Sequence, residues 1–163
     1  MQNTDGAANE CQLFCTFKIA QRLFGIKVTD IKEIHPLVNF TPVSHATEDV
    51  KGFVNIRGQV HLVIDLRVLL GFGHKSIDDS SQILLFKPHV GEAFGILVDF
   101  IGDVVETRWE RIEALGKTDH NIHDKTLHHF SDFAEGICKL ENELMVILNS
   151  MELLKKIEEK HNK

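Results

Sequence analysis

No run of apolar residues in the sequence is long enough to cross a membrane as a helix. The first residues carry no basic segment followed by an apolar stretch, so they do not predict a secretory signal peptide. The three cysteines are an odd number and cannot all pair within one chain, which indicates free thiols in a reducing compartment. We therefore expect a soluble, cytoplasmic protein without direct membrane insertion.

Positive charge is also scarce. The formal net charge is −6 and the pI is near 5.9, and no local stripe of lysine and arginine stands out, so nucleic acid is not an expected partner. The sequence has no G-x-S-x-G elbow, no P-loop and no dinucleotide fingerprint. The paired carboxylates Asp78 and Asp79 fall in a polar linker rather than a pocket. We expect no enzyme and no cofactor.

What the chain does contain is an internal repeat. The segment 24–34 returns without a gap at 94–104, with the shared pattern F-G-I-x-V-x-x-I-x-acid-aliphatic. The segment 52–65 likewise matches 136–149. In F-G-I-x-V the apolar residues alternate, as a half-buried strand requires. Two ungapped matches in the same order predict an internal duplication.

Turn and cap residues coincide in the two copies. Gly58 and Asn142 fall at the same place between two apolar runs, and both residue types tolerate the positive φ of a tight hairpin. Asp65 and Asn149 each end a strand and precede a helix-like stretch, where either predicts an N-cap. The first of these helices should end near 71–73, and the second should run on through Ile157.

The pattern predicts a mainly β fold with few helices. We expect strands near 13–19, 23–28, 53–57, 60–64, 82–87, 93–98, 103–107, 136–140 and 144–148. Many short, evenly spaced strands favour small barrels over a βαβ sheet. A lobe of about 70 residues buries only a marginal core alone, so we expect two lobes that pack together and exchange a strand.

These residues closely resemble the CheW family of chemotaxis coupling proteins. The family's opening motif, Y/F-G-I-x-hydrophobic-x-x-V-x-E-I, corresponds to residues 24–34, and V-x-G-hydrophobic-x-N-L-R-G corresponds to 50–58. The strand ending in I-D-L-R is present at 64–67, and the second half follows with 94–99 and 135–137. The resemblance covers about residues 13–157, and its N-[IL]-R-G segment is the most specific part.

The resemblance implies two intertwined, SH3-like five-stranded β-barrels with short helices and a C-terminal helix. It also implies a non-catalytic adaptor that couples the cytoplasmic tip of membrane chemoreceptors to the regulatory domain of a CheA-type histidine kinase in arrays at the inner membrane. Carried over by position, the implied partner-binding residues are Ile31, Glu33, Asn55, Arg57 and Gly58.

From the residues alone, these side chains predict less. Glu33 is a surface charge on a short helical turn whose inward residues are Val28, Ile31 and Ile34. Arg57 lies at a hairpin tip, and its repeat counterpart is Glu141, so the turn itself does not require a cation. Because arginine is common in interface hot spots, we favour a binding role specific to the first lobe.

Two departures from the family pattern stand out. Leu62 occupies the place of a usual proline, and His61 beside it is unusual. The segment 116–131 is rich in histidine and matches no family motif; its candidate metal ligands are His120, His123, His128 and His129. No tight ligand spacing fixes these side chains, so we favour a solvated polar segment over a metal site.

The predicted organisation is a single CheW-like domain over 13–157, with a flexible tail at 1–12 and a charged tail at 158–163. Its first lobe would cover about 20–73, and its second about 82–157 plus the first strand. Two alternatives to chemotaxis coupling remain. One is a coupling protein of a divergent two-component system, such as one for surface motility; the other is a metal-binding regulatory protein that uses the segment 120–129.

Overall fold

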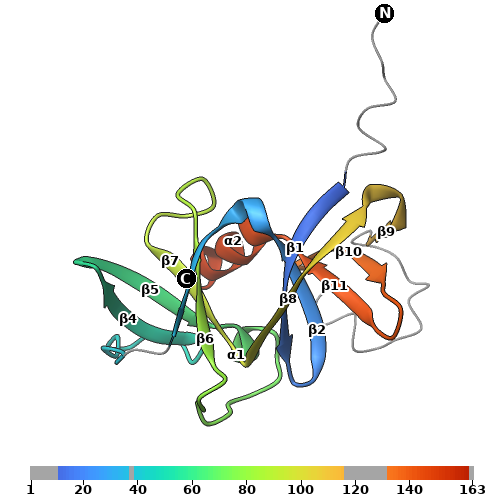
Figure 1. Cartoon of the computed structure of the whole chain (residues 1–163). Helices are drawn as coiled ribbons and strands as arrows, with labels where there is room; N and C mark the ends of the chain where they lie inside the picture. The colour runs from blue at the N-terminus through green and yellow to red at the C-terminus, as the bar shows by residue number, and fades with distance from the viewer. Residues whose placement is uncertain (1–10, 37–38, 116–131, 162–163) are drawn as a thin grey trace, which may run out of the picture.

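The structure is a computed structural model, and it describes residues 11–36, 39–115 and 132–161. Within those residues the chain is mainly β, as predicted (Figure 1). The strands are β1 (Cys11–Ile19), β2 (Arg22–Lys27), β3 (Ile31–Pro36), β4 (Val50–Ile56), β5 (Gln59–Asp65), β6 (Gln82–Phe86), β7 (Phe94–Val98), β8 (Phe100–Arg108), β9 (Ile112–Ala114), β10 (Ala134–Lys139) and β11 (Leu144–Leu148). The helices are α1 (Leu66–Leu69) and α2 (Ser150–His161), and the 3-10 turns are η1 (Val28–Asp30) and η2 (Trp109–Arg111).

The strands form two sheets, one in each lobe. The order of one is β8-β1-β2-β11-β10-β9, and that of the other is β3-β6-β7-β5-β4. Neighbouring strands run antiparallel except for two pairs, β2 with β11 and β5 with β7. In the five-stranded sheet, the place that corresponds to β9 is taken by a single residue, Thr41, which forms an isolated β-bridge with Phe53 of β4.

The two parallel pairs show that the lobes exchange hairpins. Phe24 of β2 lies opposite Val146 of β11, and Phe94 of β7 lies opposite Leu62 of β5. Phe24 and Phe94 are equivalent in the repeat, and so are Leu62 and Val146. Each half of the chain therefore contributes its first hairpin to the sheet of the other half, so the predicted intertwined fold and internal duplication are confirmed.

This exchange divides the strands differently from the lobe ranges predicted by sequence. The strand β2 belongs to the sheet of the second half, and β6 and β7 belong to that of the first. The ranges are wrong here because they kept consecutive strands together, whereas the parallel ladders carry each hairpin across. Regular structure extends from β1 at Cys11 to α2 at His161 in the described residues.

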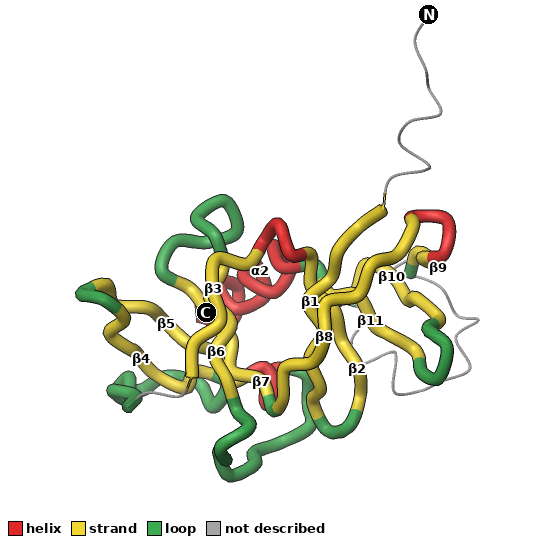
Figure 2. The backbone as a smooth tube through the Cα atoms, in the orientation of Figure 1, coloured by secondary structure: helices red, strands yellow, loops and turns green. Residues whose placement is uncertain are grey.

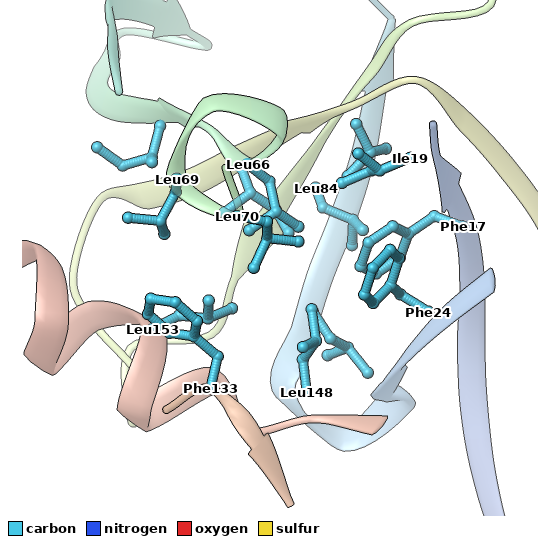
Figure 3. Close-up of a cluster of buried hydrophobic side chains, with 14 of the residues drawn as sticks. Phe17, Ile19, Phe24, Leu66, Leu69, Leu70, Leu84, Phe133, Leu148 and Leu153 are labelled. Carbon is cyan, nitrogen blue, oxygen red and sulfur yellow. The ribbon is translucent and has the colours of Figure 1, made fainter. Parts of the chain in front are cut away.

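A single core joins the two lobes. Figure 3 shows side chains from both halves meeting there, among them Phe17 and Phe24, whose stacked rings lie 5.9 Å apart. Leu66 of α1 and Leu153 of α2 are fully buried in the same cluster, and Figure 2 shows α2 between the two lobes. Each barrel adds a smaller core of its own. Because a lobe of this size has a marginal core alone, the shared core stabilises both as one body.

The predicted caps are present, while one predicted turn is wrong. The Asp65 carboxylate accepts hydrogen bonds from the backbone N–H groups of Arg67 and Val68, and Asn149 caps α2 in the same way. Gly71 follows α1 with a φ of 86°, a C-terminal stop. Asn142, however, does not adopt a positive φ; the β10–β11 turn closes through the Leu140 N–H and the Glu143 carbonyl instead.

Candidate partner-binding site

The strand β3 carries Glu33, where the sequence predicted a helical turn. The 3-10 turn ends at Asp30, and Ile31 starts an edge strand that pairs with β6. The apolar residues Ile31 and Ile34 have helical spacing, but along the strand the inward positions are Ile31, Glu33 and His35. The prediction was wrong because two polar residues, Glu33 and His35, occupy inward positions of this strand. The sequence therefore lacks the alternation of apolar and polar residues by which a half-buried strand is usually predicted.

The β4–β5 turn holds Arg57 and Gly58 with φ angles of 53° and 82°. Positive φ at both central positions is the mark of a type I′ hairpin. The Asn55 side-chain oxygen accepts a hydrogen bond from the Gly58 N–H at 2.9 Å, which fixes the turn. The Arg57 side chain is 75% exposed. Asn55 and Gly58 thus build the turn that presents Arg57, as the hairpin prediction expected.

Glu33 and Arg57, which the sequence singled out separately, meet in the folded chain. Arg57 Nη1 donates to Glu33 Oε2 at 2.8 Å, and His35 Nε2 lies beside Glu33 Oε1. The strands β3 and β4 form opposite edges of their sheet, so this contact spans the end of the first barrel. Partial desolvation acts to raise the pKa of Glu33, but Arg57 and then His35 outweigh it, and the pKa lies below its usual value.

His61 of β5 is buried inside the same barrel. It is 4% exposed, and its Nδ1 has no hydrogen-bond partner among the described residues. Burial, followed by the positive charge of Lys32, lowers the pKa of His61 below its ordinary value, although Glu33 opposes this. The sequence analysis noted that a histidine is unusual for the family at position 61, but it predicted no function for this residue.

Ile31 is the predicted site residue whose side chain packs against the central core. Sequence reasoning did not assign the exposed apolar residues to a site. Among them are Ile34, Phe53 and Val60 on the first barrel, and Leu13, Phe100 and Val104 on β1 and β8. Ile34 and Val104 are repeat counterparts on the two edge strands β3 and β8. Each lobe therefore exposes an apolar surface.

No group of three metal-binding side chains occurs among residues 11–36, 39–115 and 132–161. The histidine-rich segment 116–131, with its four candidate ligands, lies outside the described residues. Cys15 and Cys138 are buried while Cys11 is exposed, and burial raises the pKa of the Cys15 thiol. No helix in the described part of the chain is long and apolar enough to span a membrane.

Comparisons with known proteins agree with this architecture. A family model described as "CheW-like domain" matches residues 13–158. The chemotaxis protein CheW of Klebsiella aerogenes is 28% identical over 102 residues, which cover 62% of this chain and 60% of that protein. The CheW of Bacillus subtilis is 29% identical over 86% of this chain and 85% of its own length. The crystal structure of the scaffolding protein TtCheW from Thermoanaerobacter tengcongensis superimposes with a TM-score of 0.73 at 25% identity, covering 86% of this chain and 90% of that one.

Proposed function

Because this chain belongs to the CheW-like domain family, we propose that it is a non-catalytic adaptor that couples chemoreceptors to a CheA-type histidine kinase in chemotaxis. The observation that carries this proposal is that one continuous core holds two barrels, each with its own exposed apolar surface. A body of this kind holds two partners at a fixed spacing, because the lobes cannot move apart without breaking the shared core.

The end of the first barrel is the proposed contact with the receptor tip. Arg57 projects from a tight turn, and its pairing with Glu33 orients the guanidinium. The fixed fork of arginine donors suits carboxylate and amide groups on a helical partner. A pair this exposed contributes little to the stability of the fold, so its value lies in setting the register and specificity of binding.

The outer face of the β4–β5 hairpin is the proposed contact with the kinase regulatory domain. Asn55 lies opposite Val60, and Phe53 lies opposite Leu62, so these side chains share one face. Phe53 and Val60 are both exposed. Apolar residues at the centre with polar residues around them match the usual anatomy of a protein interface. The adaptor would work in the cytoplasm, recruited to receptor arrays at the inner membrane.

A pull-down from the native lysate tests the coupling role. The variants are wild type, Arg57→Glu, and Glu141→Arg as a matched charge reversal at the equivalent turn of the second lobe. Recovered kinase and receptor are quantified by mass spectrometry. We expect wild type and Glu141→Arg to recover both, and Arg57→Glu to lose receptor selectively. If folded wild type captures neither protein, the coupling role is wrong; if Arg57→Glu retains receptor, the site is elsewhere.

A further inference from the structure

His61 occupies a position that the second barrel gives to an apolar side chain. Its repeat counterpart is Met145, which is fully buried. On β5, His61 shares its inward face with Val63, and it lies opposite Val54 of β4. Both valines belong to the core of the first barrel. An imidazole therefore replaces a hydrophobic side chain in the interior of the barrel toward which Glu33 also points.

The charged groups around His61 come from β3. Lys32 and His35 disfavour a proton on His61, and Glu33 favours one. The strand β7, which pairs with β5, carries no titratable residue, and Lys51 of β4 acts on Asp65. Among the described residues that act on His61, Glu33 is thus the one carboxylate.

Glu33 Oε2 accepts a hydrogen bond from Arg57, and Glu33 Oε1 faces His35. Oε1 nevertheless has no hydrogen-bond partner among the described residues, and the same holds for His61 Nδ1. A buried imidazolium would be costly without a counter-ion. The carboxylate that acts on His61 is Glu33, whose Oε1 is without a hydrogen-bond partner in the described part of the chain while its Oε2 holds Arg57. A movement of Glu33 toward His61 would therefore lengthen its bond to Arg57.

We propose that the end of the first barrel is an acid-sensitive docking surface, in which protonation of His61 draws the Glu33 carboxylate inward and releases Arg57. With Arg57 no longer oriented, the surface binds its partner less tightly. The switch itself is a property of this chain; its effect on receptor binding rests on the proposed function. Since burial lowers the pKa of His61, the change occurs as the pH falls below the ordinary histidine value of 6.5.

Nuclear magnetic resonance of the free protein tests the switch without a partner. The His61 ring and the Arg57 Nε–H signals are followed from pH 7.5 to 5.0 in wild type, His61→Met and His61→Gln. The methionine variant copies the side chain that the second barrel uses at this place, and the glutamine variant is a neutral polar alternative if methionine impairs folding. In wild type we expect the Arg57 signal to move with the midpoint of His61, and in both variants to lose that transition.

His35 also touches Glu33, so His35→Gln is the decisive control. We expect this variant to keep the transition. Loss of the transition in His35→Gln, or its persistence in His61→Met, would overturn the assignment to His61. A His61 ring that is already protonated at pH 7.5 would overturn it as well.

Binding of a soluble fragment of the receptor's cytoplasmic tip gives the functional readout. One linked proton changes affinity by at most about tenfold per pH unit, so we expect wild type to lose affinity between pH 7.5 and 5.0 with a slope no steeper than this limit. His61→Met should retain its affinity at both pH values. If the fragment binds to neither protein at any pH, the receptor assignment fails while the resonance experiment still decides the switch. Equal pH dependence in wild type and His61→Met would refute acid-sensitive docking.

Discussion

Replacing Asp65 by alanine and by asparagine separates two effects of this buried side chain. Its carboxylate caps α1 by accepting from the Arg67 and Val68 N–H groups at 3.1 and 3.4 Å. The residue is only 7% exposed, and this burial raises the pKa of Asp65 above its usual value, although the two cap hydrogen bonds and Lys51 oppose the shift. The cap stabilises the fold, whereas the buried charge costs stability. The second half of the chain places the neutral Asn149 at the same position.

Alanine at position 65 removes the cap, so we expect a loss of about 1–2 kcal/mol in the free energy of unfolding. For a chain of this size that corresponds to a fall in Tm of about 2–8 °C. Asparagine keeps the acceptor and removes the charge, so Asp65→Asn should be at least as stable as wild type at pH 7.5. An acid whose pKa is raised by folding loses its stabilising contribution as the pH rises from the unfolded value through the folded one. The advantage of asparagine should therefore shrink as the pH falls.

Urea unfolding at pH 7.5 and 4.5 measures both effects. Asn149→Ala serves as the control for losing a cap of the same geometry without a change of charge. If Asp65→Asn were as unstable as Asp65→Ala at pH 7.5, the charge itself would be needed. The reasoning from burial would then be refuted.

Three further predictions follow from other contacts. A Cβ at position 95 would lie 2.8 Å from the Leu84 carbonyl oxygen, so Gly95→Ala should lower the free energy of unfolding by about 1–3 kcal/mol and move the urea midpoint to a lower concentration; an unchanged midpoint would contradict that packing. Cys11 is exposed and Cys15 is buried, so a thiol reagent should label wild type rapidly at Cys11 and leave Cys15 unlabelled until the protein unfolds, as peptide mapping would show. The pKa of Glu33 is lowered by folding, so its contribution is present above the unfolded value of 4.5 and is lost as the pH falls through the folded value. Titration of the Glu33 side-chain carboxyl by nuclear magnetic resonance should give a midpoint below the ordinary glutamate value in wild type and a higher one in Arg57→Gln; equal midpoints would count against the pair.

Local signals in the sequence predicted much of the fold. The alternation in F-G-I-x-V identified β2 and β7, and Asp65 and Asn149 identified both helix starts, because these features depend on neighbouring residues only. The strand β3 was missed because Glu33 and His35 take its inward face. The parallel pairs β2–β11 and β5–β7 were beyond the prediction, since parallel pairing joins segments distant in sequence and leaves no local mark.

The candidate site was predicted residue by residue but not as a unit. Glu33 and Arg57 came from separate motifs, and only closure of the barrel brings them to 2.8 Å. His61 stood out as unusual, yet its burial inside the barrel depends on the same closure. Val104 lies in a segment with an ordinary strand pattern, so its exposure to solvent was not predicted either. Long-range geometry of this kind is what the sequence of one chain does not reveal.

The hairpin exchange has a consequence for how the chain is made on the ribosome. The strand β2 is complete at Lys27, but its parallel partner β11 begins only at Leu144. Throughout most of translation, the nascent chain therefore presents an unpaired strand edge, which is a ready template for pairing with other chains. Premature termination before β11 would leave this edge permanently uncovered, so we expect truncated products to aggregate or be degraded rather than survive as a stable half.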